Sequence, residues 1–416
     1  MARKRALKRG TLFIAVTMAA IVVGLGFRYL TGSKKTGLTR DHLAEALREP
    51  ATFYQFPTEV TIPMDDELHP SRGSPIQVKT KVEYSFDPSL QTFMQDLIHS
   101  YGPDYGAFVA MEADTGKVLS MVSFSRKQGF NENLALRATF PSASVFKVVT
   151  AAAAIEGKKM SAESVISFNG RNHTLYRGNV LKSSVTRWTR YITLKEAFAR
   201  SVNTVFGKIG AFNIGPVGLR QYADRFGFDR RIASDFPMSP GHADIPNDPF
   251  GLAESASGFT KENTMSPMQG ALIAATLAND GMMMEPYIVQ SVHLESGKSI
   301  YSASPHKNGL VVDPETAQEL RQMMRETVKR GTSSGTFRGF AKGPYKEIEV
   351  GGKTGSLTGN SPKGRYDWFV GYAQMGDRKI AIASLTVHEK LWRVKSSYLA
   401  RRAIEHYFKK HGKLKE

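Results

Sequence analysis

The sequence contains no cysteine, and this absence excludes several kinds of chemistry at once. Disulfide bonds, thiolate metal sites and cysteine nucleophiles all need a sulfhydryl group, so none of them is available to this chain. A lipoprotein anchored through a modified cysteine is excluded for the same reason. The ten histidines show no His-Glu-x-x-His or similar spacing, so the sequence predicts no metal site.

Acidic residues are comparatively scarce, since 38 Asp and Glu stand against 56 Lys and Arg and the formal net charge is +18. Part of this charge lies near the two ends of the chain, in Arg3, Lys4, Arg5, Lys8 and Arg9 and in Lys409, Lys410, Lys413 and Lys415. A basic chain raises the question of a nucleic-acid partner. No interleaved stripe of aromatic and basic residues and no DNA-reading helix motif supports that interpretation, so no nucleic-acid partner is expected.

Residues 11–27 form an uncharged apolar run of 17 residues. This length reaches the lower end of the roughly 17–25 residues that span a bilayer, and it exceeds the roughly 7–15 of a signal-peptide core. No small-x-small cleavage site follows, and the basic residues before the run predict a cytoplasmic N-terminus. We therefore expect a cytoplasmic tail at residues 1–10 and a single-pass anchor in the cytoplasmic (inner) membrane at residues 11–30. The remaining chain would lie on the periplasmic side. A cleaved signal peptide is the alternative, and it leaves the compartment unchanged.

The rest of the chain divides into a polar segment and a domain. Residues 31–84 are rich in turns, with one helix candidate at Asp41–Arg48, and we expect a juxtamembrane stalk there. Residues 85–412 are expected to fold as one domain. It opens with a capped helix start at Asp87-Pro88, followed by a hairpin pattern at residues 107–122. Further helices are predicted at residues 144–156, 193–200, 204–212, 266–278, 314–329 and around 399–408, and strands at 348–352, 368–373 and 380–387. This order predicts an α+β fold (an α/β sandwich) in which helices flank an antiparallel sheet, with an all-helical lobe inserted.

One polar pair interrupts the apolar helix predicted at residues 144–156. Ser144 and Lys147 are three residues apart, so they share one helix face. A serine hydroxyl needs a nearby base to act as a nucleophile, and burial in an apolar wall makes a lysine lose its proton more readily. The pair is therefore a candidate nucleophile and base. Ser-x-x-Lys is a common pattern, however, and a helix start followed by a lysine that reaches solvent is the plainer interpretation.

Two further patterns place polar groups where a cleft is expected. Ser201 and Asn203 lie between two predicted helices, so both side chains can point into one groove. The other pattern is Lys353, Thr354, Gly355 and Ser356, which follows the strand predicted at residues 348–352. A glycine there allows close approach of a ligand, and a lysine there supplies a cation. Each pattern alone is weak, because residues 167–169 and 35–37 repeat them outside such settings.

Taken in order and in these settings, the three patterns resemble the motif set of the penicillin-binding proteins and serine β-lactamases. Ser144 and Ser201 are 57 residues apart and Ser201 and Lys353 are 152 apart, and the long second interval is similar to that of the penicillin-binding transpeptidases. Neighbouring stretches also resemble that family, at residues 86–91, 106–123, 192–201 and 368–373. The resemblance covers roughly residues 85–410.

The resemblance implies a β-lactamase/transpeptidase-like fold. It also implies a peptidoglycan D,D-transpeptidase that acts on D-Ala-D-Ala stem peptides through an acyl-serine intermediate and binds β-lactam antibiotics covalently. In that interpretation Ser144 is the nucleophile, Lys147 the base, and Ser201 relays a proton to the leaving amine. The implied catalytic residues are Ser144, Lys147, Ser201, Asn203 and Lys353.

The same resemblance assigns substrate binding to the strand pattern. Thr354 and Ser356 would hold the substrate carboxylate beside Gly355, and the backbone amides of Ser144 and Ser356 would form an oxyanion hole. No metal or organic cofactor is expected. The expected partners are peptidoglycan stem peptides, β-lactam antibiotics, the inner membrane through residues 11–30, and proteins of a cell-wall synthesis complex.

Related activities stay open at the level of the sequence. A D,D-carboxypeptidase or an endopeptidase would use the same residues. A serine β-lactamase would have to activate a deacylating water, and no Glu-x-x-Leu-Asn element follows Asn203. A sensor or scaffold that binds β-lactams without turnover would also keep the motifs. A bifunctional synthase is not expected, because about 115 residues separate the predicted anchor from Ser144, too few for a glycosyltransferase domain.

Overall fold

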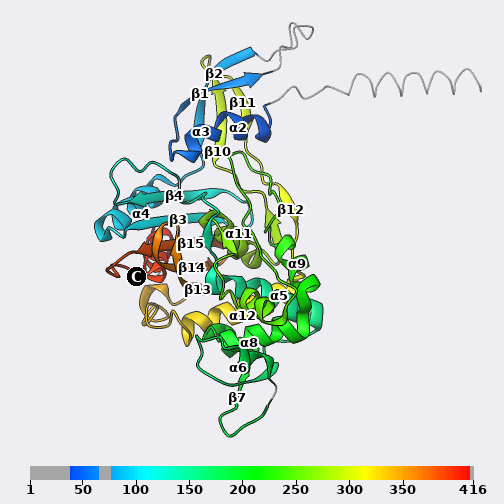
Figure 1. The fold of residues 1–416 in the computed structure, drawn as a ribbon. Coiled ribbons are helices and arrows are strands. Elements are labelled where there is room, and N and C mark those ends of the chain that lie inside the picture. Colours follow the sequence, from blue (N-terminus) through cyan, green and yellow to red (C-terminus); the bar gives the residue numbers. More distant parts are fainter. Residues whose placement is uncertain (1–37, 65–75, 183, 413–416) are drawn as a thin grey trace, which may run out of the picture. The chain divides into compact units, whose positions relative to one another are not determined.

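The computed structural model describes residues 38–64, 76–182 and 184–412 (Figure 1). Two compact units are distinguished, and the larger one, Thr39–Ile62 with Gln77–Glu416, holds every element of the candidate site. Of the smaller unit, Met1–Leu38 with Pro63–Ile76, only residues 38, 63, 64 and 76 are described. The predicted tail and anchor, residues 1–30, lie outside the described residues. Within the described ranges, no helix combines the length and the apolar character that crossing a membrane requires.

The main sheet of the larger unit has five antiparallel strands in the order β13-β14-β15-β3-β4. Its strands are β3 (Tyr105–Glu112), β4 (Val118–Ser125), β13 (Glu349–Asn360), β14 (Lys363–Met375) and β15 (Arg378–His388). The predicted hairpin and the three predicted late strands are confirmed, although the late strands are longer than the sequence indicated. The expected α+β fold with an antiparallel sheet is likewise confirmed. β13 forms one edge of this sheet, which leaves that edge available to other elements.

Helices pack against both faces of this sheet, because successive side chains of a strand point to opposite sides. On one face, α4 (Pro88–Tyr101) and α13 (Ser396–His411) share a buried cluster with the strands that includes Leu90, Phe108, Phe369 and Leu399. On the other face lies α11 (Pro267–Ala278), where a β-carbon on Gly270 would meet Val370 of β14 at 3.0 Å. The sheet is therefore held between two helical layers.

The first of these helices begins as predicted. The side chain of Asp87 accepts hydrogen bonds from the amides of Ser89 and Leu90, at 2.9 and 3.1 Å, and Pro88 occupies the first turn. A capping carboxylate at this position satisfies amides that have no partner inside the helix. The helix ends at Gly102, whose φ of +53° is the left-handed conformation common after helices.

The remaining helices form the inserted helical lobe and its surroundings. They are α5 (Lys147–Lys158), α6 (Arg177–Leu181), α7 (Leu194–Ala199), α8 (Asn203–Lys208), α9 (Gly215–Arg225), α10 (Pro249–Ser257) and α12 (Pro314–Lys329). The helix predicted at residues 204–212 is shorter than expected, since α8 passes into a π-helical turn at Ile209–Ile214. Short strand pairs accompany them: β5 (Phe140–Pro141) with β8 (Thr264–Met265), β6 (Val165–Phe168) with β7 (Arg190–Thr193), and β9 (Met282–Met284) with β12 (Lys307–Leu310).

The segment predicted as a stalk contains more secondary structure than the single helix expected there. Two helices, α2 (Arg40–Ala46) and α3 (Arg48–Thr52), replace the predicted helix at Asp41–Arg48. β1 (Glu59–Met64) and β2 (Ile76–Tyr84) join β10 (Val289–Leu294) and β11 (Ser299–Ser302) in a four-stranded sheet in the order β1-β2-β10-β11. These strands carry many polar side chains, and the pairing of β2 with β10 joins residues about 200 positions apart, which no local pattern predicts. The domain limits given above stay predictions.

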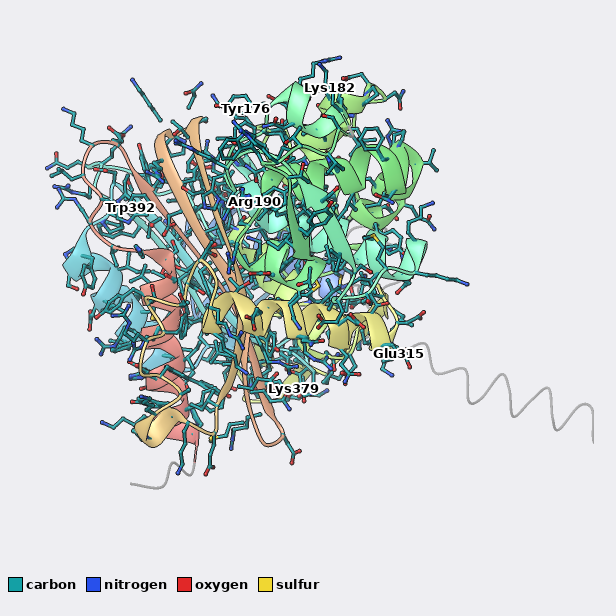
Figure 2. The ribbon with its side chains drawn as sticks, turned by 90° about the horizontal axis from the view of Figure 1, so that it is seen from below. Tyr176, Lys182, Arg190, Glu315, Lys379 and Trp392 are labelled. Carbon is teal, nitrogen blue, oxygen red and sulfur yellow. The ribbon has the colours of Figure 1, made fainter. Side chains whose placement is uncertain are left out.

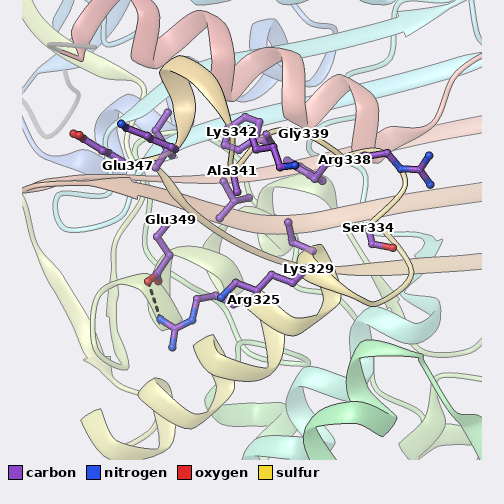
Figure 3. Close-up of a pocket in the computed structure, with 15 residues that line it drawn as sticks. Arg325, Lys329, Ser334, Arg338, Gly339, Ala341, Lys342, Glu347 and Glu349 are labelled. Carbon is purple, nitrogen blue, oxygen red and sulfur yellow. Dashed lines mark hydrogen bonds and ion pairs between the residues drawn. The ribbon is translucent and has the colours of Figure 1, made fainter. Parts of the chain in front are cut away.

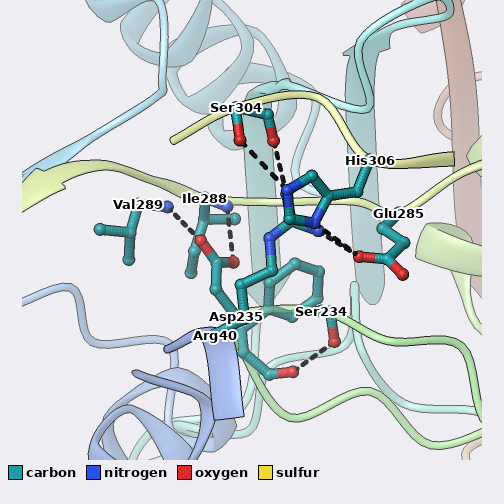
Figure 4. A network of polar contacts seen from close by, with 9 residues as sticks. Arg40, Ser234, Asp235, Glu285, Ile288, Val289, Ser304 and His306 are labelled. Carbon is teal, nitrogen blue, oxygen red and sulfur yellow. Dashed lines mark hydrogen bonds and ion pairs between the residues drawn. The ribbon is translucent and has the colours of Figure 1, made fainter. Parts of the chain in front are cut away.

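Arg40 ties the start of α2 to a segment much later in the chain (Figure 4). Its guanidinium lies 2.6 Å from a carboxylate oxygen of Glu285, donates to the carbonyl of Ser304 at 3.2 Å, and stacks 5.6 Å from the ring of Tyr287. The Arg40 and Glu285 side chains are largely buried, so this ion pair is less screened by solvent than a surface pair. Residues before the predicted domain thus contribute to its packing.

Candidate active site

Ser144 lies in a tight turn rather than in the α-helix predicted to begin there. A 3₁₀ turn spans Ala143–Phe146, and α5 begins only at Lys147. The amide of Ser142 donates to the carbonyl of Asn263 at 2.7 Å, which joins the approach to the turn to the neighbouring β8 segment. Ala143 has a φ of +48°, a left-handed conformation that costs a residue with a β-carbon roughly 1–2 kcal/mol. The prediction of the helix was therefore right in type and wrong in its first turn.

The amine of Lys147 is fully buried and has three partners. Its Nζ lies 2.8 Å from Oγ of Ser144, 2.7 Å from Oδ1 of Asn203 and 2.5 Å from the carbonyl oxygen of Ser257. The amide oxygen and the carbonyl oxygen can only accept hydrogen bonds, so they take both protons of a neutral amine. The lone pair of that amine is then left for the hydroxyl of Ser144.

Burial favours this neutral form of Lys147. Removal from water lowers the pKa of its amine well below the ordinary value, and the nearby charge of Lys353 lowers the pKa further. The 3₁₀ turn that holds Ser144 leads directly into α5, so Lys147, the first residue of α5, lies one turn further along the chain and next to Ser144. The arrangement has the geometry of a nucleophile with its base.

Ser201 and Lys353 form the second polar contact of the site. Nζ of Lys353 donates to Oγ of Ser201 at 3.0 Å and to the carbonyl of Thr354 at 2.9 Å. Lys353 is buried, and burial lowers the pKa of its amine to about 7. Ser201 has a φ of +55° in the turn between α7 and α8, so it is a second residue with backbone strain at this site.

Asn203 connects the two pairs. It is the first residue of α8, and besides its contact with Lys147 its side-chain amide donates to the carbonyl of His173 at 3.0 Å. Its backbone amide donates to the carbonyl of Asn172 at 2.8 Å. Because both ends of its side chain are engaged, the position of its amide oxygen beside Lys147 is fixed.

The run from Lys353 to Ser356 lies within the edge strand β13 and not after a strand as the sequence suggested. A β-carbon on Gly355 would be 3.3 Å from the carbonyl oxygen of Ser142 and 3.2 Å from Val145, so β13 packs tightly against the Ser144 turn. Oγ1 of Thr354 lies 2.5 Å from Oγ1 of Thr332, and Oγ of Ser356 accepts from Nε of Arg365 at 3.2 Å. All three sequence patterns therefore meet at one place.

Several residues at this place were not identified from the sequence: Asn172, His173, Ser257, Gly258, Thr332 and Arg365. Ser257 and His173 take part through their backbone carbonyls, which no residue-type pattern reveals. Thr332 lies in the connection after α12, where nothing in the sequence indicates contact with Thr354. A weak signal existed for Gly258, because a glycine after a helix is typical of a close approach or a left-handed turn.

A separate cavity of about 860 Å³ opens between the end of α12, the connection at residues 334–348 and the start of β13 (Figure 3). Its lining is rich in cations, including Arg325, Lys329, Arg338 and Lys342, and Arg325 pairs with Glu349 at 2.8 Å. None of the eight residues predicted from the sequence lines it. The cavity is therefore separate from the candidate active site, although both include residues of β13: the cavity its first residues, and the site the run from Lys353 to Ser356.

Comparisons with known proteins agree with one another. A family model described as "Penicillin binding protein transpeptidase domain" matches residues 106–406. "Peptidoglycan D,D-transpeptidase PbpA" of Mycobacterium tuberculosis (strain ATCC 25618 / H37Rv) is 28% identical over 346 residues, which are 73% of this chain and 66% of that protein. "Stage V sporulation protein D" of Bacillus subtilis is 25% identical over 336 residues, 76% of this chain and 50% of that protein. The chain thus spans about half to two thirds of the length of these relatives.

Solved structures give the same result. A D,D-transpeptidase domain of a peptidoglycan glycosyltransferase from Eggerthella lenta superposes with a TM-score of 0.66 at 25% identity, covering 80% of this chain and 84% of that one. A ceftriaxone acyl-enzyme complex of penicillin-binding protein A from M. tuberculosis superposes with a TM-score of 0.64 at 25% identity, covering 80% and 81%. The fold is therefore shared with proteins of this description.

Proposed function

The chain belongs to the penicillin-binding protein transpeptidase family, and we propose that it is a peptidoglycan D,D-transpeptidase whose nucleophile is Ser144. The observation that supports this most is the set of contacts around Lys147. A buried amine with a lowered pKa lies 2.8 Å from Oγ of Ser144, while both of its amine protons have other acceptors. Such a group can take the hydroxyl proton at neutral pH.

In the proposed first step, Oγ of Ser144 attacks the carbonyl carbon of the D-Ala-D-Ala peptide bond. The hydroxyl proton moves to Nζ of Lys147, and a C–O bond forms. The negative charge that develops on the carbonyl oxygen is held by the backbone amides of Ser144 and Ser356. An oxyanion hole of this kind is typically worth about 3–4 kcal/mol per donor.

The second part of the step breaks the C–N bond and releases D-alanine. Ser201 gives its hydroxyl proton to the leaving amine and is resupplied by Lys353, with which it shares a hydrogen bond. The product is an ester between the substrate acyl group and Ser144. An amine of a neighbouring stem peptide then attacks this ester, and the ester C–O bond breaks as a new peptide bond forms. Lys147 returns its proton to Oγ of Ser144, and the proton lost by the attacking amine passes through Ser201 and restores Lys353.

Substrate recognition is assigned to the edge of β13. The hydroxyls of Thr354 and Ser356 would bind the terminal carboxylate next to the amine of Lys353, and Gly355 keeps the strand against the Ser144 turn. A β-lactam would enter the same place, because it carries an amide carbonyl and a carboxylate at a similar separation. It would leave a long-lived acyl group on Ser144.

We also propose that residues 11–30 anchor the chain in the cytoplasmic membrane with residues 1–10 inside. The groove would then face the periplasm, where stem peptides are cross-linked. This rests on the apolar run and the basic residues before it.

Labelling with a fluorescent penicillin tests the nucleophile. Wild type should carry a stable label and Ser144→Ala should carry none, and a label on both would remove Ser144 from its role. Products from purified stem pentapeptides then identify the activity. Cross-linked dimers that have lost one D-alanine support the transpeptidase, whereas monomeric tetrapeptides alone would identify a carboxypeptidase and rapid loss of the label a β-lactamase.

A further inference from the structure

One part of the helical lobe combines positive charge with exposed aromatic side chains. It comprises β6, α6, β7 and their connections, residues 165–193, which we call the basic lobe. These residues include no aspartate or glutamate, and their cations are Arg171, Arg177, Lys182, Arg187 and Arg190. Figure 2 labels Tyr176, Lys182 and Arg190 on this lobe.

Several large apolar side chains of the basic lobe are exposed to solvent. Trp188 is 71% exposed, Tyr191 64% and Tyr176 63%, and Val165 and Val185 are similarly exposed. A single exposed hydrophobic residue is ordinary, but several within one short segment mark a surface that contacts something. The sequence showed no regular spacing of these residues, because they come from a hairpin, a short helix and their loops.

Cations and rings of the basic lobe lie next to each other. The guanidinium of Arg187 is 4.8 Å from the ring centre of the exposed Trp188. The guanidinium of Arg190 is 4.3 Å from the ring centre of Phe168, which is buried and holds Arg190 in place without being open to a ligand itself. A ring with a cation beside it can pack on the C–H face of a sugar while the cation binds an anionic group of the same ligand.

The basic lobe is joined directly to the candidate active site. The loop between β6 and α6 provides the carbonyls of Asn172 and His173 that fix Asn203. Lys208 of α8 donates to the carbonyl of Ser167 in β6 at 3.2 Å. A ligand bound on this surface would therefore lie next to the elements that hold Asn203 and, through Asn203, the candidate active site.

We propose that the basic lobe binds the wall polymer itself, a glycan strand whose stem peptides carry carboxylates, and holds the strand from which a peptide enters the groove. This rests on the proposed function, because it takes the ligand to be the substrate polymer. Sugar rings match the exposed aromatic side chains, and peptide carboxylates match the cations. An anionic membrane would also attract the cations. The hydrogen bonds of the lobe carbonyls of Asn172 and His173 to Asn203 favour instead a ligand that also reaches the candidate active site.

The test is co-sedimentation of the full chain with purified insoluble peptidoglycan. The double variant Arg187→Ala/Trp188→Ala removes one exposed cation and one exposed ring. The matched control Lys307→Ala/Leu310→Ala removes an exposed cation and an exposed apolar side chain from β12. We expect the apparent Kd to rise about tenfold in the lobe variant, as for an interface anchor, and to change less than twofold in the control. Raising the salt concentration should weaken wild-type binding.

Two further measurements keep the outcomes distinct. Penicillin should acylate the lobe variant at the wild-type rate, and Ser144→Ala should still sediment with the polymer. Unchanged sedimentation of the lobe variant would overturn the inference, as would a larger effect of the two substitutions on binding to vesicles of anionic phospholipid than on binding to peptidoglycan. Neutral vesicles serve as the reference, because the proposed anchor at residues 11–30 would bind vesicles of either kind. Failure of penicillin to label wild type would instead contradict the proposed function.

Discussion

Gly258 lies so close to the carbonyl of Ala143 that a β-carbon on the glycine would fall 1.9 Å from the carbonyl oxygen. Gly258 ends α10 in a left-handed conformation with a φ of +64°. The residue before it, Ser257, accepts the hydrogen bond from Lys147. The end of α10 therefore sets the position of both the Ser144 turn and the amine beside it.

The first prediction is that Gly258→Ala nearly abolishes acylation in a protein that still folds. The new methyl group must push the Ser144 turn and α10 apart, and a displacement of about 1 Å at reacting groups can cost roughly 100-fold in rate. The measurement is the second-order rate constant for acylation by penicillin. Gly376→Ala is the control, because Gly376 has a similar φ of +57° with nothing within 4 Å of an added β-carbon. Equal rates in both variants would disprove the steric argument.

The rate constant for acylation by penicillin should fall at low pH, and Asn203→Asp should move this acid limb of the pH profile to higher pH. A carboxylate in place of the amide oxygen, 2.7 Å from Nζ of Lys147, favours the charged amine and raises its pKa. Since the mechanism needs the neutral amine, the rate at low pH falls and recovers as the pH rises. Asn203→Ala also loses the contact with His173 but adds no charge, so its limb should not move upward. An unmoved limb in Asn203→Asp would argue against Lys147 as the base.

The alkaline limb should belong to Lys353, if its charge binds the ligand carboxylate. The pKa of this amine is about 7, so the cation is lost as the pH rises above 7 and the acylation constant of the free enzyme should fall. Lys353→Arg keeps its charge to above pH 12 and should abolish this limb whatever its absolute rate. Lys363→Arg, at the exposed start of β14, should leave the profile unchanged. Retention of the limb in Lys353→Arg would assign it to another group.

Thr332→Val should weaken recognition of the ligand carboxylate without removing the nucleophile. The hydroxyl of Thr332 lies 2.5 Å from that of Thr354, and one hydrogen bond is worth about 0.5–1.5 kcal/mol, a factor of roughly 3–10. The acylation constant for penicillin should fall by this factor, and Thr332→Ser should restore it. A penicillin methyl ester, which lacks the carboxylate charge, should be affected less. An equal loss with the ester would indicate a general structural defect.

Asp235→Ala should destabilise the fold without a direct effect on the site. The buried carboxylate accepts the backbone amides of Ile288 and Val289, each at 2.9 Å (Figure 4). Leaving both amides without a partner should cost about 2–4 kcal/mol, seen as a lower thermal midpoint. Asp244→Ala, at an exposed position, should change the midpoint little. A midpoint equal to wild type would show that water replaces the carboxylate.

The same residue makes a pH-dependent contribution. Burial raises the pKa of Asp235 to about 6 from 3.8. The folded state therefore binds the proton more tightly, and the favourable contribution of the protonated group is lost as the pH rises from about 4 to 6. The stability difference between wild type and Asp235→Ala should shrink over this range. A constant difference from pH 4 to 6 would contradict the raised pKa.

Local patterns predicted most elements around the main sheet, and geometry explains where they failed. The start at Asp87 and the apolar runs of β3, β4 and β15 are determined by neighbouring residues, so sequence alone identifies them. The start of α5 was misplaced because the left-handed backbone of Ala143 is imposed by packing against Gly258 and β13. A residue with a β-carbon gives no signal of that conformation. β2 was missed because its partner β10 lies about 200 residues away, and β1 because it pairs with β2 at the edge of that same sheet.

The residues of the candidate site likewise fall into those that the sequence predicted and those that it missed. Residues with reactive side chains, from Ser144 to Lys353, were predicted because their types, order and settings resemble the motif set of a known family. Asn172, His173 and Ser257 contribute backbone carbonyls, for which any residue type would serve. Thr332 becomes relevant only because the connection after α12 returns to β13. The basic lobe was overlooked because its residues are close in space without being periodic in the chain.

The hydrogen bond between Lys353 and Ser201 joins positions 152 residues apart, and Lys147 needs α8 and α10 around it before its amine is buried. A chain that has not yet added β13 to the sheet possesses Ser144 but lacks the environment that makes it react. Under the proposed function, a β-lactam would inactivate only copies that have finished folding. Copies that complete their folding only after the drug is gone would escape it and supply fresh enzyme.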